Sequence, residues 1–341
     1  MKSSITKLAL LPLFLAAPAF ACDLCGCYTP STEAITLSTH GIYGGVAEQF
    51  THFGTLRIDG DKVGNPTGQY LNSSITQVVA GYSFLDNRLS LQLNVPLIYR
   101  SFKRPEGFDI DRGTESGLGD ISVLANYQLF RYASPVAKPA PDGKSAGKNV
   151  AVFVNEEPAF TASLNVFAGI KFPTGDSSRL KEEFHEEEIE GAPESGIHGH
   201  DLALGTGSYD ALFGTEFFTR YHSFFFQADA QFTLRGDGRH SYHYANDLSW
   251  SGGPGYYLIR KNGDSLALQC VVSGEYKDTD RFQGRVAEDT GITSVFVGPR
   301  LLGTVGRVSG EIGVDLPVHV ENTSFQATAD YRIRAAVTVH F

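Results

Sequence analysis

The sequence ends on Asp330-Tyr-Arg-Ile-Arg-Ala-Ala-Val-Thr-Val-His-Phe341, a run in which apolar and polar side chains alternate. Successive side chains of a β-strand point to opposite faces, so this run predicts a strand with one apolar and one charged face. The apolar face would carry Tyr331, Ile333, Ala335, Val337, Val339 and Phe341. Taken alone, such a strand fits the edge of a soluble β-sandwich as well as the closing strand of a membrane barrel.

The N-terminus has the features of a secretory signal peptide. Two lysines precede an apolar run, residues 8–17, that is too short to span a bilayer, and Ala19-Phe20-Ala21 forms a small-x-small cleavage site. We therefore expect residues 1–21 to be a signal peptide and the mature chain to begin at Cys22. A cysteine there also allows lipidation, but the signal lacks the leucine usual in lipoproteins, which favours plain cleavage.

The composition argues against a helical membrane protein. The 341 residues include 24 Phe, 15 Tyr and 37 Gly, and the mean hydropathy is -0.13. After the signal, no stretch approaches the roughly 18 uncharged apolar residues that a membrane helix needs, so membrane insertion would require a barrel. The net charge of -10 argues against nucleic acid as a partner, and 4 Cys are too few for a disulfide scaffold.

Strand-length segments of alternating polarity recur along the chain. We expect twelve, at about Thr36–Ile58, Ser73–Phe84, Arg88–Tyr99, 120–129, Phe160–Phe172, Ser208–Arg220, Phe224–Arg235, Asp247–Ile259, Ser265–Tyr276, Gly291–Leu302, Val308–Val320 and Phe325–Phe341. Their connections mostly alternate between short and long, which is typical of single-chain outer-membrane barrels. The predicted fold is therefore all-β, a closed antiparallel transmembrane β-barrel of about 12 strands over residues 36–341, with both termini on the periplasmic side.

Some connections depart from this scheme. Residues 133–148 form a long link where a short turn is expected, and residues 321–324 form a short link where a long loop is expected. The strand count therefore carries a margin of one hairpin. Polar loops are expected over residues 101–116 and 173–204, and the second of these is long enough to hold one short helix.

Charged residues on these strands fall on the polar face, which would line the barrel interior. An outward Arg or Lys would cost about 2–4 kcal/mol at the bilayer midplane. The predicted lumen-lining residues are Asp120, Lys171, Asp210, Glu216, Asp229, Arg235, Glu275, Arg300, Glu311, Asp315, Arg332 and Arg334. Two interpretations stay open: these charges pair across a filled interior, or they line a wet lumen that passes or binds small solutes.

Three cysteines lie close together after the predicted cleavage site. Cys22, Cys25 and Cys27 form C-x-x-C-x-C in a segment, residues 22–35, that we expect to lie in the periplasm. This spacing can hold one Cu(I) or Zn ion, or form a disulfide that leaves one thiol. It suggests an alternative function, a metal or redox handover module with the barrel as anchor or conduit. No C-x-x-C-H is present, so covalent haem is not expected.

The longest loop contains a second group of candidate ligands. Three histidines, His185, His198 and His200, could gather a divalent ion with the nearby acids Glu186, Glu187 and Asp201. A solvated acidic loop is the alternative explanation. We find no nucleophile elbow, phosphate loop or H-E-x-x-H motif, so an enzyme is not expected.

Three motifs support a family resemblance. They are Gly117-Leu-Gly-Asp120, Lys171-Phe-Pro-Thr-Gly175 and Gly205-Thr-Gly-Ser-Tyr-Asp210. In this order they resemble outer-membrane proteins named for the meta pathway of phenol degradation, over residues 41–341. The resemblance implies a transporter-like barrel in a Gram-negative outer membrane, often taken to admit aromatic or other small hydrophobic compounds. Its partners would be outer-membrane lipid, a small solute and, through the C-terminal strand, the barrel-assembly machinery. The cysteine cluster is not part of this pattern.

Overall fold

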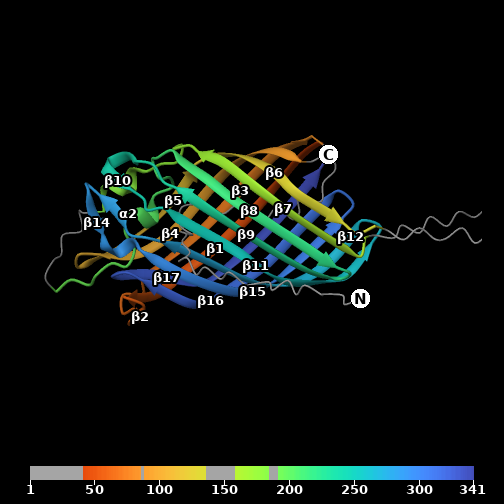
Figure 1. Cartoon of the computed structure of the whole chain (residues 1–341). Helices are drawn as coiled ribbons and strands as arrows, with labels where there is room; N and C mark the ends of the chain where they lie inside the picture. The colour runs from red at the N-terminus through yellow and green to blue at the C-terminus, as the bar shows by residue number, and fades with distance from the viewer. Residues whose placement is uncertain (1–40, 86–87, 136–157, 184–190) are drawn as a thin grey trace, which may run out of the picture.

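The computed structural model describes residues 41–85, 88–135, 158–183 and 191–341 (Figure 1). Within these ranges, twelve long antiparallel strands form the barrel wall. They are β1 (Gly41–Ile58), β3 (Tyr70–Phe84), β4 (Leu89–Glu106), β6 (Ser122–Ala133), β7 (Phe160–Lys171), β8 (Asp210–Tyr221), β9 (Phe224–Leu234), β11 (Asp247–Lys261), β12 (Asp264–Lys277), β15 (Ile292–Val305), β16 (Val308–Asn322) and β17 (Phe325–His340). The predicted signal peptide, the segment 22–35 and the first five residues of the predicted barrel lie outside the described residues.

Five shorter strands lie at the end of the barrel that carries most of the long connections, opposite the end that holds Gly41 and Phe341. They are β2 (Asp61–Lys62), β5 (Asp109–Leu118), β10 (Tyr242–His243), β13 (Asp280–Phe282) and β14 (Arg285–Ala287). We call this the loop end, and the opposite end, which holds Gly41 and Phe341, the terminal end. Among the described residues, no helix has the length and apolar character to cross a bilayer.

The barrel closes by pairing its first and last strands. β1 pairs with β17 from Tyr43↔His340 to Ile58↔Phe325, and it pairs with β3 along its other edge. Every long strand therefore has two neighbours and the wall has no open edge, as a membrane requires of backbone hydrogen-bonding groups. The predicted twelve-strand closed barrel is confirmed.

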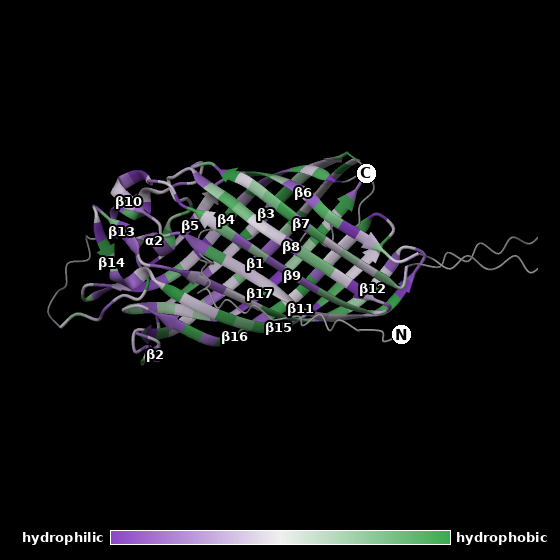
Figure 2. Cartoon of the chain, viewed as in Figure 1, coloured by the Kyte–Doolittle hydropathy of each residue, from purple (hydrophilic) through white to green (hydrophobic). Residues whose placement is uncertain are grey.

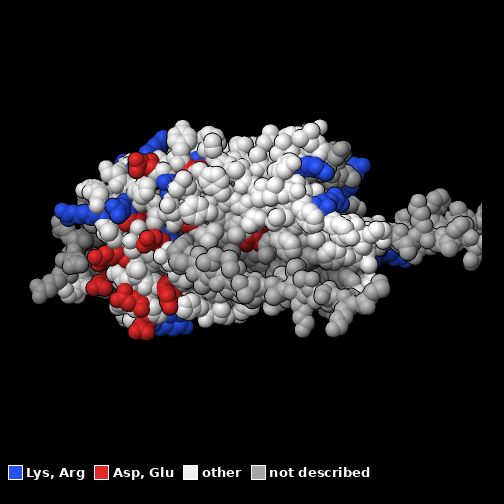
Figure 3. All heavy atoms as spheres, viewed as in Figure 1, with Lys and Arg blue, Asp and Glu red and all other residues white. Residues whose placement is uncertain are grey.

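The two faces of the wall differ as the alternation predicts. On β17, Ile333 and Val337 are exposed, whereas Arg332 and Arg334, on either side of Ile333, are buried. Figure 2 shows hydrophobic and hydrophilic residues alternating along the strands. Figure 3 shows Lys, Arg, Asp and Glu gathered toward the two ends of the visible face, with few of them on the band between. The outer surface thus has the apolar belt of a lipid-embedded wall.

The prediction of a polar loop over residues 101–116 is wrong. β4 continues to Glu106 and pairs with β5 in a hairpin, while β6 takes over as the neighbour of β4 at its other end. The alternation itself explains this extension, because Arg100, Phe102 and Arg104 are buried inside while Ser101 and Lys103 between them are less so. The polar composition of this stretch is that of a loop, although it forms the extension of β4 and its partner β5.

The interior is less uniformly polar than the sequence predicts. Leu124, Phe167 and Leu212 form one buried cluster on the inner wall, and Tyr43 and Val79 form another. In a barrel this narrow, inward side chains meet one another, so apolar residues can be buried inside as well as face lipid.

The outer face carries two carboxylates where only apolar residues were expected. Glu48 points outward from β1 and accepts hydrogen bonds from Ser74 and Thr76 of β3. Asp330 was predicted to face inward, but register shifts between β1 and β17 turn it to the outer face. There it accepts a hydrogen bond from Thr55 at 2.5 Å and lies 3.6 Å from the His52 imidazole. Neighbouring polar groups therefore satisfy both carboxylates.

A cross-link tests the closure register. In a variant whose native cysteines are serine, Val46→Cys and Val337→Cys would face each other across the β1–β17 pair, and both positions are exposed on the outer wall. We expect oxidation or a short bismaleimide to join them, measured as an altered gel mobility of the unfolded chain. Val46→Cys with Leu301→Cys on β15 is the matched control and should not cross-link. Cross-linking of the control pair alone would contradict the register.

Candidate functional site: the barrel interior

The connection between β7 and β8 folds into the loop end of the barrel. Its described parts, residues 172–183 and 191–209, are called the plug here and include the short helices η1 (Ser178–Lys181) and α2 (Gly199–Leu202). Ile197 and Leu202 are fully buried. They pack with inward side chains of five strands, Phe53, Leu71, Phe102, Phe296 and Ala329. Because β1, β3, β4, β15 and β17 all contact it, the plug lies within the barrel mouth, where Figure 1 shows α2.

Hydrogen bonds fix the plug to the wall. The buried Arg100 guanidinium of β4 donates to the carbonyl oxygens of Asp201 at 2.5 Å and Ala203 at 2.6 Å. From a second strand, the backbone N–H of Ala327 in β17 donates to the carbonyl of Gly196 at 2.7 Å. Charged donors to backbone carbonyls are among the stronger hydrogen bonds in proteins. The plug is therefore held to the wall at two points, on β4 and on β17, which are three positions apart in the closed ring of strands.

The three sequence motifs meet in one ion cluster below the plug. Lys171 Nζ lies 2.8 Å from Asp210 and 3.4 Å from Asp120. Arg235 lies 2.9 Å from Asp210 and donates from Nε to Asp247 at 2.6 Å. All five residues are buried. We call them the loop-end cluster. Four of the five were predicted as lumen-lining, and their mutual pairing favours the filled-interior interpretation at this level.

The loop-end cluster also anchors the two ends of the plug. Asp120 accepts hydrogen bonds from the backbone N–H of Gly175 at 3.0 Å and of Thr206 at 2.8 Å. A Cβ on Gly205 would lie 2.6 Å from Asp120 Oδ1, and one on Gly175 would lie 2.6 Å from the Leu204 carbonyl. Positions 175 and 205 therefore need glycine, because a side chain at either would collide with the neighbouring backbone or with the Asp120 carboxylate.

A second group of charges lines the wall between β12 and β17. Arg332 lies 3.1 Å from Glu275, Arg334 lies 2.9 Å from Asp315, and Arg300 lies 3.7 Å from Glu311. All six side chains are at least nine-tenths buried. Removing water from both partners strengthens their attraction, but it makes the loss of either partner costly.

The two remaining predicted residues, Glu216 and Asp229, also face inward. Glu216 accepts hydrogen bonds from the amides of Asn126 and Asn165 at 3.4 Å and 3.2 Å. Asp229 accepts one from Ser251 at 2.6 Å. The structure thus places all twelve predicted residues on the interior side, in two ion-paired groups and two hydrogen-bonded sites.

Two of the predicted histidines, His198 and His200, lie together in the plug, whereas His185 falls outside the described residues. His200 Nδ1 is 2.5 Å from Glu183, and its Nε2 is 3.3 Å from Asp201. His198 Nδ1 is 2.9 Å from Asp289, which belongs to the connection between β12 and β15. Burial would lower the pKa of His200, but the charges of Asp201 and Glu183 outweigh it and raise the pKa to about 10. The histidines are therefore part of a charge cluster, and the solvated-loop explanation is wrong for His200.

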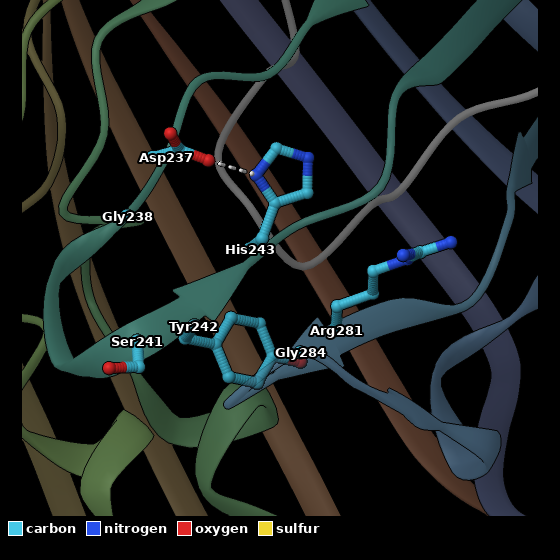
Figure 4. Close-up of a pocket in the computed structure, with 7 residues that line it drawn as sticks. All are labelled: Asp237, Gly238, Ser241, Tyr242, His243, Arg281 and Gly284. Atoms are coloured by element: carbon cyan, nitrogen blue, oxygen red, sulfur yellow. Dashed lines mark ion pairs between the residues drawn. The ribbon is translucent and has the colours of Figure 1, made fainter.

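A pocket of 470 Å³ lies at the rim of the loop end (Figure 4). It is lined by Asp237, Gly238, Ser241, Tyr242, His243, Arg281 and Gly284. The His243 imidazole points toward Asp237 at 3.2 Å, and both side chains are exposed. Tyr242 donates its phenolic O–H to Asp280 at 2.5 Å. The pocket thus offers a ligand few sheltered polar groups.

Sequence reasoning missed several interior residues. Arg100 and Arg104 are buried in β4, beyond the predicted end of that strand, and continuing the alternation past Tyr99 would have found them. Glu183 and Asp289 reach the histidines from separate segments, and no local pattern marks them. The predicted metal ligands Cys22, Cys25 and Cys27 lie outside the described residues.

This architecture defines a class of protein: a β-barrel of outer-membrane type with a polar interior and an inserted loop. The structure is similar to the crystal structure of the COG4313 outer membrane channel from Pseudomonas putida F1, with a TM-score of 0.61 at 15% identity over 92% of this chain and 100% of that one. Weaker similarities include the β domain of the Bordetella autotransporter BrkA, with a TM-score of 0.44 at 8% identity over 89% and 100%.

A Pseudomonas aeruginosa FadL homologue is also similar, with a TM-score of 0.36 at 10% identity over 89% of this chain and 90% of that one. No family model matches the sequence, and no curated protein sequence matches it. The similarity to the Pseudomonas putida channel supports the fold, an outer-membrane type barrel.

Breaking the loop-end cluster should destabilise the barrel. Asp210→Asn leaves Lys171 and Arg235 buried with less negative charge, so we expect the free energy of unfolding to fall by about 3–5 kcal/mol. Denaturant unfolding in detergent, followed by fluorescence of the single Trp, would measure it. Asp237→Asn, at the exposed rim pair, should produce no measurable change. Equal stability of the two variants would contradict the importance of the cluster.

Proposed function

We propose that this protein is an outer-membrane channel for small solutes whose mouth is narrowed by the plug. The observation that carries the proposal is a charged interior enclosed by an apolar wall, with a loop inserted at one end. A barrel that served only as an anchor would gain nothing from buried charges, because replacing buried ion pairs with apolar side chains is often neutral or stabilising.

The likeness to the Pseudomonas putida channel supports this function. That protein is an outer membrane channel, and the match extends over its whole length and 92% of this chain. The plug would face the outside of the cell and the terminal end would face the periplasm, as in single-chain barrels with short periplasmic turns. The exposed Phe341 would then lie where the assembly machinery binds the last strand.

The mixed interior supports a proposal for the class of solute. Inward apolar side chains lie beside the charged groups: Leu124, Phe167 and Leu212 pack together, and Phe225 lies 5.0 Å from Tyr257 between ring centres. Such a surface suits a small compound with an aromatic or apolar body and a polar group. This agrees with the aromatic or hydrophobic compounds that the family resemblance implies.

The wall charges below the loop-end cluster would favour cations. Among the predicted residues there, the carboxylates are Glu216, Asp229, Glu275, Glu311 and Asp315, and the guanidiniums are Arg300, Arg332 and Arg334. Rings of carboxylates select cations in channels, so this excess of negative charge sets the expected preference.

Trimming the plug should open the channel. Replacing residues 178–202 with Gly-Ser-Gly keeps the loop-end cluster and joins Ser177 to Ala203, whose neighbours Asp176 and Leu204 already share a backbone hydrogen bond of 2.9 Å. We expect single-channel conductance in planar bilayers to rise severalfold, because the plug fills the mouth. The control shortens the β13–β14 hairpin and should leave conductance unchanged. Absence of conductance in both wild type and trimmed protein would contradict the channel function.

Neutralising one wall guanidinium should increase cation selectivity. In Arg334→Gln the Asp315 carboxylate loses its partner at 2.9 Å, so the interior gains net negative charge. The reversal potential of the plug-trimmed barrel in a salt gradient would measure the shift toward cations. Asp315→Gln should shift it in the opposite direction. Identical reversal potentials would mean that these residues do not face the ion path.

A further inference from the structure

We propose that the plug holds a divalent transition-metal ion, of the Zn²⁺ class, on His198, His200 and Asp201. One donor atom from each of these residues lies within 4.8 Å of the other two. Two imidazole nitrogens and one carboxylate oxygen form a donor set that suits Zn²⁺, which would displace the Nε2 proton of His200 on binding and leave one position for water or another ligand. The site does not depend on solute passage through the barrel.

The distances within the cluster fit a shared metal ion. His200 Nε2 and Asp201 Oδ1 are 3.3 Å apart. Tetrahedral bonds of about 2.0–2.1 Å place neighbouring ligand atoms at about 3.3 Å, so this pair already has the required spacing. The His198 ring is stacked on that of His200, with centroids 5.8 Å apart, and one of its nitrogens lies within 4.8 Å of the other two donor atoms.

Carboxylates outside the donor set orient both imidazoles. Glu183 contacts His200 Nδ1 at 2.5 Å and Asp289 contacts His198 Nδ1 at 2.9 Å. Nδ1 of each ring is thus engaged by an acid, which assigns Nε2 of each ring to the metal. Protein zinc sites commonly show this carboxylate–histidine–metal arrangement, because the acid fixes the ring and raises the basicity of the ligating nitrogen.

The cluster is sheltered and preorganised. The side chains of His200 and Glu183 are 5% and 2% exposed, and that of His198 is 12% exposed. The backbone N–H of His198 donates to Asp201 Oδ2 at 2.8 Å, which leaves Oδ1 directed at His200. Since Asp289 belongs to a different connection from the ligands, a bound ion would tie the plug to the β12–β15 connection.

Zinc binding to the full chain tests the proposal. Cys22, Cys25, Cys27 and Cys270 are replaced by serine so that no thiol competes, the protein is refolded in detergent and treated with EDTA, and ZnCl₂ is titrated by calorimetry. We expect one Zn²⁺ per chain. His198→Asn should weaken binding at least tenfold, and Asp289→Asn should weaken it by about 10–100-fold as an orienting residue. His243→Asn, which alters the rim histidine, should bind as the parent does.

A second measurement reports the geometry and does not depend on one variant folding. Co²⁺ in place of zinc should give the intense visible absorption of a tetrahedral site in the parent and the His243→Asn protein, reduced in either His198→Asn or Asp289→Asn. Folding of each variant is checked by heat-dependent gel mobility. No zinc binding by the folded parent, or binding that neither cluster variant weakens, would overturn the proposal.

Discussion

Closure of the backbone hydrogen-bond ring is the constraint on which the rest of this structure depends. A wall with lipid on one side cannot leave a strand edge unpaired, and the β1–β17 ladder removes the last edge. Once the ring is closed, each strand must place alternate residues inside and outside. The interior then receives the charged side chains that the outer face excludes, and those charges need partners because little water surrounds them.

The need of the interior charges for partners determines how the loop end is built. The Asp120 carboxylate pairs with Lys171 and accepts hydrogen bonds from the backbone N–H groups of Gly175 and Thr206. A single buried acid therefore joins the wall to the plug. Arg100, on another strand, donates hydrogen bonds to two carbonyl oxygens of the plug. The same polar groups that neutralise the interior therefore also position the loop that narrows it, which links barrel stability to access.

The sequence predicts the wall well because alternation is a local property. A period-two pattern such as that of β9 predicts which residues face inward without any knowledge of their neighbours. The alternation predicts the wrong face for Asp330, because the bulge there arises from the pairing of β17 with β1 and cannot be seen in the sequence of one strand. β5 was predicted as loop because residues 101–116 are rich in charged residues and glycine, and their alternation is weak.

The plug was unpredictable for a different reason. Its polar composition suggested a surface loop, whereas its burial depends on a few apolar residues, Ile197, Leu202 and Leu204, that meet side chains from distant strands. The histidine pair was visible in the sequence, but Glu183 and Asp289, which orient it, come together only through the fold.

Thiol accessibility from outside the cell tests most directly the proposed function, a barrel interior whose mouth the plug narrows. Ser273 faces inward from β12 and is buried. In a background without native cysteines, Ser273→Cys in intact cells should resist a membrane-impermeant maleimide while the plug is whole, and react once residues 178–202 are replaced. Equal labelling with the plug in place would show that the mouth is not closed by it. Failure to react in either form would show that the interior is filled below the plug.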